Sequence, residues 1–245
     1  MSVLEDLTTS PEINEESDRL GGFTPLESEV YPLTIKLAFV HVAASKARAL
    51  AVHFETDDGK ELRQQFWMTS GEAKGCKNYY INQKGEKFYL PGFNQANGLC
   101  LLTVGKEISK LETEPKVVNL YDPAQGKEAP TKVDMVTDLL GKKILGGVIK
   151  QINDKVTKDS NTGKYEPTGE TKLENEVDKF FRNRDSMTVA EIKARQTDPD
   201  FINQWKEKWV GQTRDKSSGA SGVKSGAPAP KRETGKQAPQ TSLFE

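Results

Sequence analysis

Aromatic and basic side chains are interleaved between Ser70 and Leu90, the part of the chain whose residue types could bind a ligand. The segment carries Lys74, Lys77, Lys84, Lys87, Tyr79, Tyr80, Phe88 and Tyr89. Flat rings stack on nucleobases at about 1–3 kcal/mol each, and lysines neutralise phosphates without reading sequence. The same residues could equally be core aromatics with solvated lysines. We predict a loop here, with a small hairpin around Lys84-Gly85.

Three strands are predicted directly before this segment, at Tyr31–Val42, Arg48–Thr56 and Glu61–Thr69. Their apolar residues recur at every second position, which is strand periodicity. Asp57-Asp58-Gly59-Lys60 is typical of a tight turn, because Asp-Gly tolerates positive φ angles. The opposite face of these strands carries Thr34, Lys36, His53, Arg63, Gln65 and Trp67. An apolar inner face with a basic, aromatic outer face suits a single-stranded nucleic acid.

The rest of the chain alternates short predicted elements. We expect a helix at Pro91–Leu111, a strand at Lys116–Tyr121, a short helix at Val133–Leu140, a strand at Ile144–Val156, amphipathic turns at Leu173–Phe181, and helices starting near Thr188 and Asp198. Gly146-Gly147 within a strand indicates a bulge or a sharp bend, as where a small barrel closes. Lys150 extends the basic surface, and Trp205 and Trp209 share one helix face that we expect to pack on the barrel.

Composition excludes several classes of protein. The 245 residues carry a net charge of −1, and no apolar run approaches the roughly 20 residues that span a bilayer. We therefore expect a cytoplasmic protein with no membrane partner, in which Cys76 and Cys100 stay reduced. Eight acidic residues stand against Arg19 alone through Glu29. This acidic arm either keeps the protein soluble or folds back over a phosphate-binding groove.

No catalytic pattern stands out, so we predict no enzyme, no metal and no cofactor. His41 and His53 lack the close Cys/His spacing of a zinc site. Asp57 and Asp58 could be nuclease carboxylates, but their position beside Gly59 favours turn chemistry. A nuclease is the third hypothesis, and an assay for metal-dependent strand cleavage would test it.

The chain ends in two apolar residues after a segment rich in Ser, Gly, Ala, Pro and Lys that cannot support a core. Gln240-Thr241-Ser242-Leu243-Phe244 resembles the pentapeptide that binds the bacterial sliding clamp, although Thr241 replaces the usual Leu. The resemblance implies that Gln240 hydrogen-bonds at the rim of a pocket on the clamp, while Leu243 and Phe244 fill its apolar part. Another replication protein is the next candidate partner.

The order of predicted elements matches a mainly β OB-fold, a five-stranded antiparallel barrel with an intervening helix, followed by a helical appendage and a disordered tail. With its Leu-Phe terminus, the chain resembles the single-stranded DNA-binding proteins of bacteriophage replication modules. We divide it into an acidic arm (1–29), the OB-fold (30–184), a helical appendage (185–212), a linker (213–239) and an interaction motif (240–245).

This resemblance implies sequence-tolerant coating of single-stranded DNA during replication, recombination or repair, without catalysis and in the host cytoplasm. The residues expected to bind DNA are Lys36, Arg63, Trp67, Lys74, Lys77, Tyr79, Tyr80, Lys84, Lys87, Tyr89 and Lys150.

The alternative is a clamp-binding adaptor or inhibitor whose barrel contacts protein and not DNA. It predicts that deleting Gln240 to Glu245 abolishes function, while reversing the charges of Lys74 and Lys77 does little. Measuring oligonucleotide and clamp binding side by side distinguishes the two hypotheses.

Overall fold

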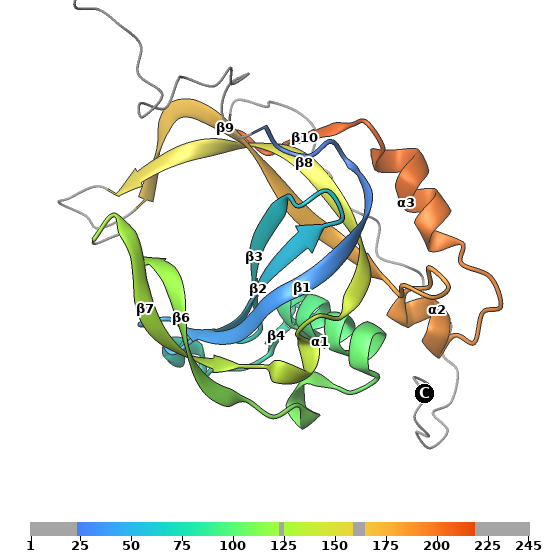
Figure 1. The fold of residues 1–245 in the computed structure, drawn as a ribbon, viewed down its shortest axis with the longest axis horizontal. Coiled ribbons are helices and arrows are strands. Elements are labelled where there is room, and N and C mark those ends of the chain that lie inside the picture. The colour runs from blue at the N-terminus through green and yellow to red at the C-terminus, as the bar shows by residue number, and fades with distance from the viewer. Residues whose placement is uncertain (1–23, 123–124, 159–164, 219–245) are drawn as a thin grey trace, which may run out of the picture.

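The computed structural model describes residues 24–122, 125–158 and 165–218, which form mainly antiparallel β-structure with few helices (Figure 1). The strands are β1 (Glu29–Val42), β2 (Arg48–Thr56), β3 (Glu61–Trp67), β4 (Tyr79–Ile81), β5 (Lys87–Tyr89), β6 (Glu114–Asp122), β7 (Lys127–Met135), β8 (Lys143–Lys158), β9 (Tyr165–Phe181) and β10 (Thr213–Asp215). The helices are α1 (Pro91–Val104), α2 (Val189–Lys193) and α3 (Phe201–Trp209), with short 3-10 turns at Glu72–Lys74, Ile108–Lys110 and Thr137–Leu139.

Strands β1, β2 and β3 form the predicted meander. Residues at alternate positions, such as Leu50, Val52 and Phe54 of β2, are fully buried in the main core. The intervening residues of β2, among them His53, lie on the outer face. Because side chains alternate across a strand, the period-2 pattern assigned the two faces of β2 correctly. In β1 it did not, because a register shift between Ile35 and Leu37 turns Leu37 and Phe39 away from the main core and into a second apolar cluster.

The long strand β1 organises the eight-stranded sheet. One edge of β1 pairs with β2; the other pairs first with β8 and then, at Phe39 and Val40, with β7. β8 pairs in turn with β9 along most of its length and, in parallel, with β10. The resulting order through the centre of the sheet is β3-β2-β1-β8-β9, while β4 and β5 form a separate hairpin.

A bulge in β9 places Asp178 outside the ladder with β8. Val177 lies opposite Val148 and Lys179 opposite Gly147, so Asp178 is the extra residue. The bulge changes the parity of the strand, so that Val177 and Phe180 both enter the main core. Gly147 must be glycine here, because a Cβ atom would lie 2.8 Å from the indole of Trp205.

No backbone ladder joins β3 to β9, so the sheet does not close into a barrel in the described part of the chain. The side-chain amide of Gln64 on β3 spans the gap instead. Its Oε1 accepts the N–H of Val177 at 2.6 Å, and its Nε2 donates to the carbonyl of Val177 at 3.1 Å. The amide thus satisfies both backbone groups that a sheet neighbour would otherwise pair.

Helix α3 packs on β8 and β9, on the face opposite the main core, whereas Ile192 of α2 belongs to the main core. Trp205 is buried with Ile149 and Phe181, and its indole N–H donates to Asp178. Glu191 forms the predicted capping box with Thr188 and also accepts the N–H groups at the start of α3. Burial raises the pKa of Glu191, but these hydrogen bonds outweigh it and the net shift is downward.

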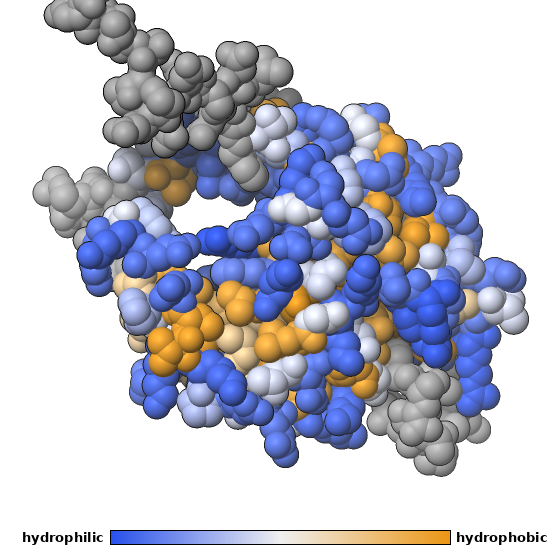
Figure 2. Space-filling model, viewed as in Figure 1, coloured by the Kyte–Doolittle hydropathy of each residue, from blue (hydrophilic) through white to orange (hydrophobic). Residues whose placement is uncertain are grey.

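Two long hairpins, β6–β7 and β8–β9, project from the same side of the sheet (Figure 1). The space-filling view shows an open gap between them beside the central strands (Figure 2). None of the helices in the described residues is long and apolar enough to cross a bilayer.

Several expectations are wrong. Val133–Leu140 is not a helix: Val133 belongs to β7, a strand obscured by Pro130 and by charged residues, and only Thr137–Leu139 forms a 3-10 turn. Leu173–Phe181 is strand β9, whose bulge produces an apolar spacing that imitates a helix. The predicted helix from Pro91 ends at Val104, where Gly105 adopts a left-handed conformation.

Two boundaries also differ. The sheet has eight strands rather than five, and Thr213–Asp215, assigned to the linker, forms β10. Residues 1–23 of the acidic arm, and Gln240, Leu243 and Phe244 of the terminal motif, lie outside the described residues.

We predict that Gln64→Leu lowers the free energy of unfolding by about 1–3 kcal/mol, because Val177 would lose the partners of both its backbone groups. Gln65→Leu is the matched control: Gln65 is the next residue, exposed on the other face, and its replacement should change stability by less than about 0.5 kcal/mol. Urea denaturation followed by circular dichroism measures both. Equal stabilities of the two variants would contradict the role given to Gln64.

Candidate nucleic-acid interface

The segment after β3 is held in a fixed shape by hydrogen bonds to its own ends and to the β1–β2 turn. The N–H of Ser70 donates to the carbonyl of Lys77, and the N–H of Lys77 donates back to the Ser70 hydroxyl. The N–H of Glu72 donates to the carbonyl of Ser45. Lys74 and Lys77 therefore sit on a closed loop fastened to the edge of the sheet.

The hairpin β4–β5 presents the aromatic residues. Asn82 orders its turn by accepting the N–H groups of Lys84 and Glu86 through its side-chain oxygen. Across the two strands, Tyr79 lies opposite Tyr89, and Tyr80 lies opposite Phe88 with the rings stacked at 5.9 Å. The predicted small hairpin around Lys84-Gly85 is confirmed.

Trp67 lies at the end of β3, beside this hairpin. It is the most exposed of the three tryptophans, with 41% of its surface accessible, and the edge of its ring meets His41. Helix α1 begins directly against its backbone: a Cβ atom on Gly92 would lie 2.3 Å from the carbonyl oxygen of Trp67. Glycine at position 92 is thus required for the helix to approach the strand this closely.

These elements enclose a groove of about 750 Å³, which we call the Trp67 groove. Its lining includes Trp67, Lys74, Lys77, Tyr79 and Tyr80, and no acidic side chain among the described residues contributes to it. Lys77 and Lys87 lie over the ring of Tyr79, with ammonium-to-centroid distances of 5.8 and 5.2 Å. The groove therefore combines exposed rings with uncompensated positive charge, which suits a stacked base and its phosphate.

The remaining predicted residues lie outside this groove. Lys36 and Arg63 are on the outer face of the sheet but form ion pairs with Glu55 and Glu61. Lys150 pairs with Glu27 and has only 19% of its side chain accessible, so it helps to fasten the segment before β1.

Two further predicted residues sit elsewhere on the hairpin. Lys84 is at the turn, and Tyr89 lines a separate pocket with Phe93, their rings 4.9 Å apart. That pocket was missed, although the run Asn94-Gln95-Ala96-Asn97 at the start of α1 is an unusually amide-rich signal.

The two histidines and the two cysteines do not line the Trp67 groove. Among the described residues, no group of three or more His, Cys, Asp or Glu side chains is placed to hold a metal ion. Burial raises the pKa of the Cys100 thiol to about 12, so this thiol is unreactive at neutral pH. Burial, followed by the positive charge of Arg63, lowers the pKa of His53 on the outer face of β2.

No protein-family model and no curated protein matches this sequence. The groove, and the fold that positions it, are therefore the observations that bear on function.

We predict that Arg63→Gln raises the pKa of His53, because the repulsive charge is lost while the Glu61 carboxylate stays nearby. The matched control is Lys36→Gln, which removes a charge from the same face but not from beside His53. Titration of the imidazole by NMR measures both variants, and equal His53 pKa values in them would contradict the assignment.

The lowered pKa of His53 also determines the direction in which pH changes the stability of the fold. Because the pKa of His53 is lower in the folded chain than the unfolded value of about 6.5, the unfolded chain binds protons more readily. The contribution of His53 to stability is therefore present above pH 6.5 and is lost as the pH falls from there through the folded value.

Proposed function

We propose that β1, β2, β3, β8 and β9 constitute an OB-fold. One support is the strand order in the sheet, β3-β2-β1-β8-β9. Another is the position of α1, which lies between β3 and β8 in the sequence. A third is the Gln64 amide, which links β3 and β9 at the two ends of that order. OB-folds are partly open barrels that bind oligonucleotides on the outer face of their second and third strands. Trp67, on the third strand, belongs to that face.

We further propose that the protein binds single-stranded DNA with little sequence preference. The observation that carries this proposal is the Trp67 groove, in which exposed rings stand beside Lys74 and Lys77 without any acidic lining residue. Stacking on Trp67 or Tyr80 requires a base whose face is free, and bases within a duplex do not offer one. The groove thus favours single strands, while its lysines supply a salt-dependent attraction to phosphate.

The biological role that follows is coating and protection of exposed strands during replication, recombination or repair, in the manner of the phage proteins that the sequence resembles. Recruitment of a sliding clamp through Gln240, Leu243 and Phe244 remains a separate expectation, because no described residue bears on it.

The test is a titration of the protein with fluorescent oligo-dT and with a matched duplex at two salt concentrations, following anisotropy and tryptophan fluorescence. We expect salt-sensitive binding to the single strand and weak binding to the duplex. Trp67→Ala and Tyr79→Ala should each weaken binding by about 1–3 kcal/mol. Trp67→Ala should also remove most of the fluorescence quenching, because Trp205 is buried and Trp209 lies on α3, outside the groove.

Two controls accompany this titration. Trp67→Phe keeps a ring at the same position and should retain most of the affinity. Lys74→Glu with Lys77→Glu should weaken binding and flatten its salt dependence, whereas the same change at Lys206 and Lys208, exposed on α3, should not. Absence of binding by the unaltered protein at low salt would overturn the proposed function.

A further inference from the structure

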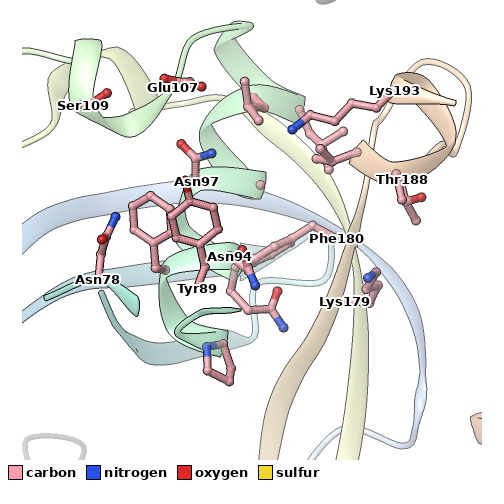
Figure 3. Close-up of a pocket in the computed structure, with 18 residues that line it drawn as sticks. Asn78, Tyr89, Asn94, Asn97, Glu107, Ser109, Lys179, Phe180, Thr188 and Lys193 are labelled. Atoms are coloured by element: carbon pink, nitrogen blue, oxygen red, sulfur yellow. The ribbon is translucent and has the colours of Figure 1, made fainter. Parts of the chain in front are cut away.

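The second pocket lies on the other side of the junction between β5 and α1 and is larger than the Trp67 groove. We call it the Tyr89 pocket; it has a volume of about 880 Å³ and is lined by β5, α1, β9 and α2 (Figure 3). Ligand pockets typically have about 300–1,000 Å³. Pro91 lines both the pocket and the groove, so the two lie on either side of this residue.

The pocket offers one prepared stacking surface. Tyr89 is 57% exposed, and the ring of Phe93 packs against it at 4.9 Å and 32°. Phe93 itself is held by the main core. This support fixes Tyr89 while leaving much of its ring accessible, so a flat ligand could stack without first ordering the side chain.

Side-chain amides surround this ring. Asn78 and Asn94 make no side-chain hydrogen bond to any other described residue, whereas Gln95 is engaged with the carbonyl of Asp178. The oxygen of Asn97 accepts the N–H of Ile108, which leaves its NH₂ group as the donor available to a ligand. Figure 3 places Asn78, Asn94 and Asn97 around Tyr89. A free side-chain amide presents a donor and an acceptor side by side, which matches N6–H and N7 of adenine, whereas cytosine offers N4–H but no acceptor on the corresponding edge.

Positive charge is concentrated at one end of the pocket. Lys193 extends from α2 toward the pocket, and Lys179 of β9 lines the same side (Figure 3). The ammonium of Lys179, however, lies over the ring of Phe201, 5.0 Å from its centroid, and burial lowers its pKa while the nearby Asp178 and Glu191 act against that shift. Lys193 is therefore the cation that the pocket offers to a phosphate. Glu107 lies on the rim away from these lysines and disfavours a phosphate at its own end.

We propose that the Tyr89 pocket holds one unpaired nucleobase of the strand that occupies the Trp67 groove, and that Asn78 and Asn94 make this position selective for adenine. The base stacks on Tyr89, and its phosphate lies toward Lys193. The inference rests on the proposed function: the groove binds any sequence, and the pocket adds a local preference.

The experiment compares anisotropy titrations of oligo-dA and oligo-dC with the full-length protein and its variants. Asn94→Ala should weaken binding of oligo-dA by about 5- to 100-fold and leave oligo-dC within twofold, because a bidentate amide contact discriminates by about this factor. Tyr89→Ala should weaken both, and Tyr89→Phe should weaken neither beyond twofold. Asn183→Ala, an exposed amide outside the pocket, is the control that should change nothing.

Thermal unfolding shows which variants are folded, and Asn78→Ala repeats the test if Asn94→Ala is not. Unchanged affinities in both the Tyr89→Ala and asparagine variants would overturn the inference, as would an equal loss for the two oligonucleotides in the asparagine variants. If the Tyr89 and asparagine variants contradict the inference but Trp67→Ala still weakens binding in the same series, the proposed function stands without the Tyr89 pocket. If the unaltered protein binds neither oligonucleotide, the proposed function fails first.

Discussion

The bulge at Val177 and Asp178 is the point on which the rest of this structure depends. Four separate elements meet there: β3 through Gln64, α1 through Gln95, α3 through Trp205 and β10 through Arg214. A regular strand would direct its backbone groups to a neighbouring strand. At the bulge, the carbonyl of Asp178 instead accepts the side-chain amide of Gln95 from α1, and its carboxylate accepts the indole N–H of Trp205 from α3. The bulge thereby joins the sheet to the helices on both of its faces.

That junction also explains how an incompletely closed sheet keeps a well-packed core. The amide of Gln64 takes the place of a peptide group between β3 and β9, so no water is needed to satisfy Val177. Phe180, brought inward by the parity change, packs against Phe54 and Phe66 from two neighbouring strands. The sheet is therefore held together across its open seam mainly by aromatic packing and one amide.

The candidate site is built where this rigid frame meets the segment between β3 and α1. The contact between Gly92 and the backbone of Trp67 fixes the start of the helix against the end of the strand. The hairpin β4–β5 is consequently anchored at both ends, with Trp67 and Tyr80 on one side of Pro91 and Tyr89 on the other. A single path for a nucleic-acid strand over Pro91 would join the sequence-tolerant groove to the amide-rich pocket.

Local pattern determined the first part of the chain. The alternation in β2 and β3, the Asp-Gly turn and the capping box at Thr188 depend on neighbouring residues, so the sequence by itself was enough to place them. The strand β1 was predicted in the same way, but not the register shift between Ile35 and Leu37 that exchanges its two faces. It also showed that rings and lysines gather between Ser70 and Leu90. The mainly β class was predicted for the same reason.

Tertiary structure decided which of those residues act together. Lys36 and Arg63 share the outer face predicted for them, yet both are paired with carboxylates: Lys36 with Glu55 of the neighbouring strand, and Arg63 with Glu61 two residues before it in β3. The apolar spacing of β9 imitated a helix because a bulge, set by packing against distant elements, changed the strand's parity. Local sequence thus predicted the first three strands and the chemistry available, whereas pairing between remote segments decided where that chemistry converges, because those contacts form only when the whole sheet assembles.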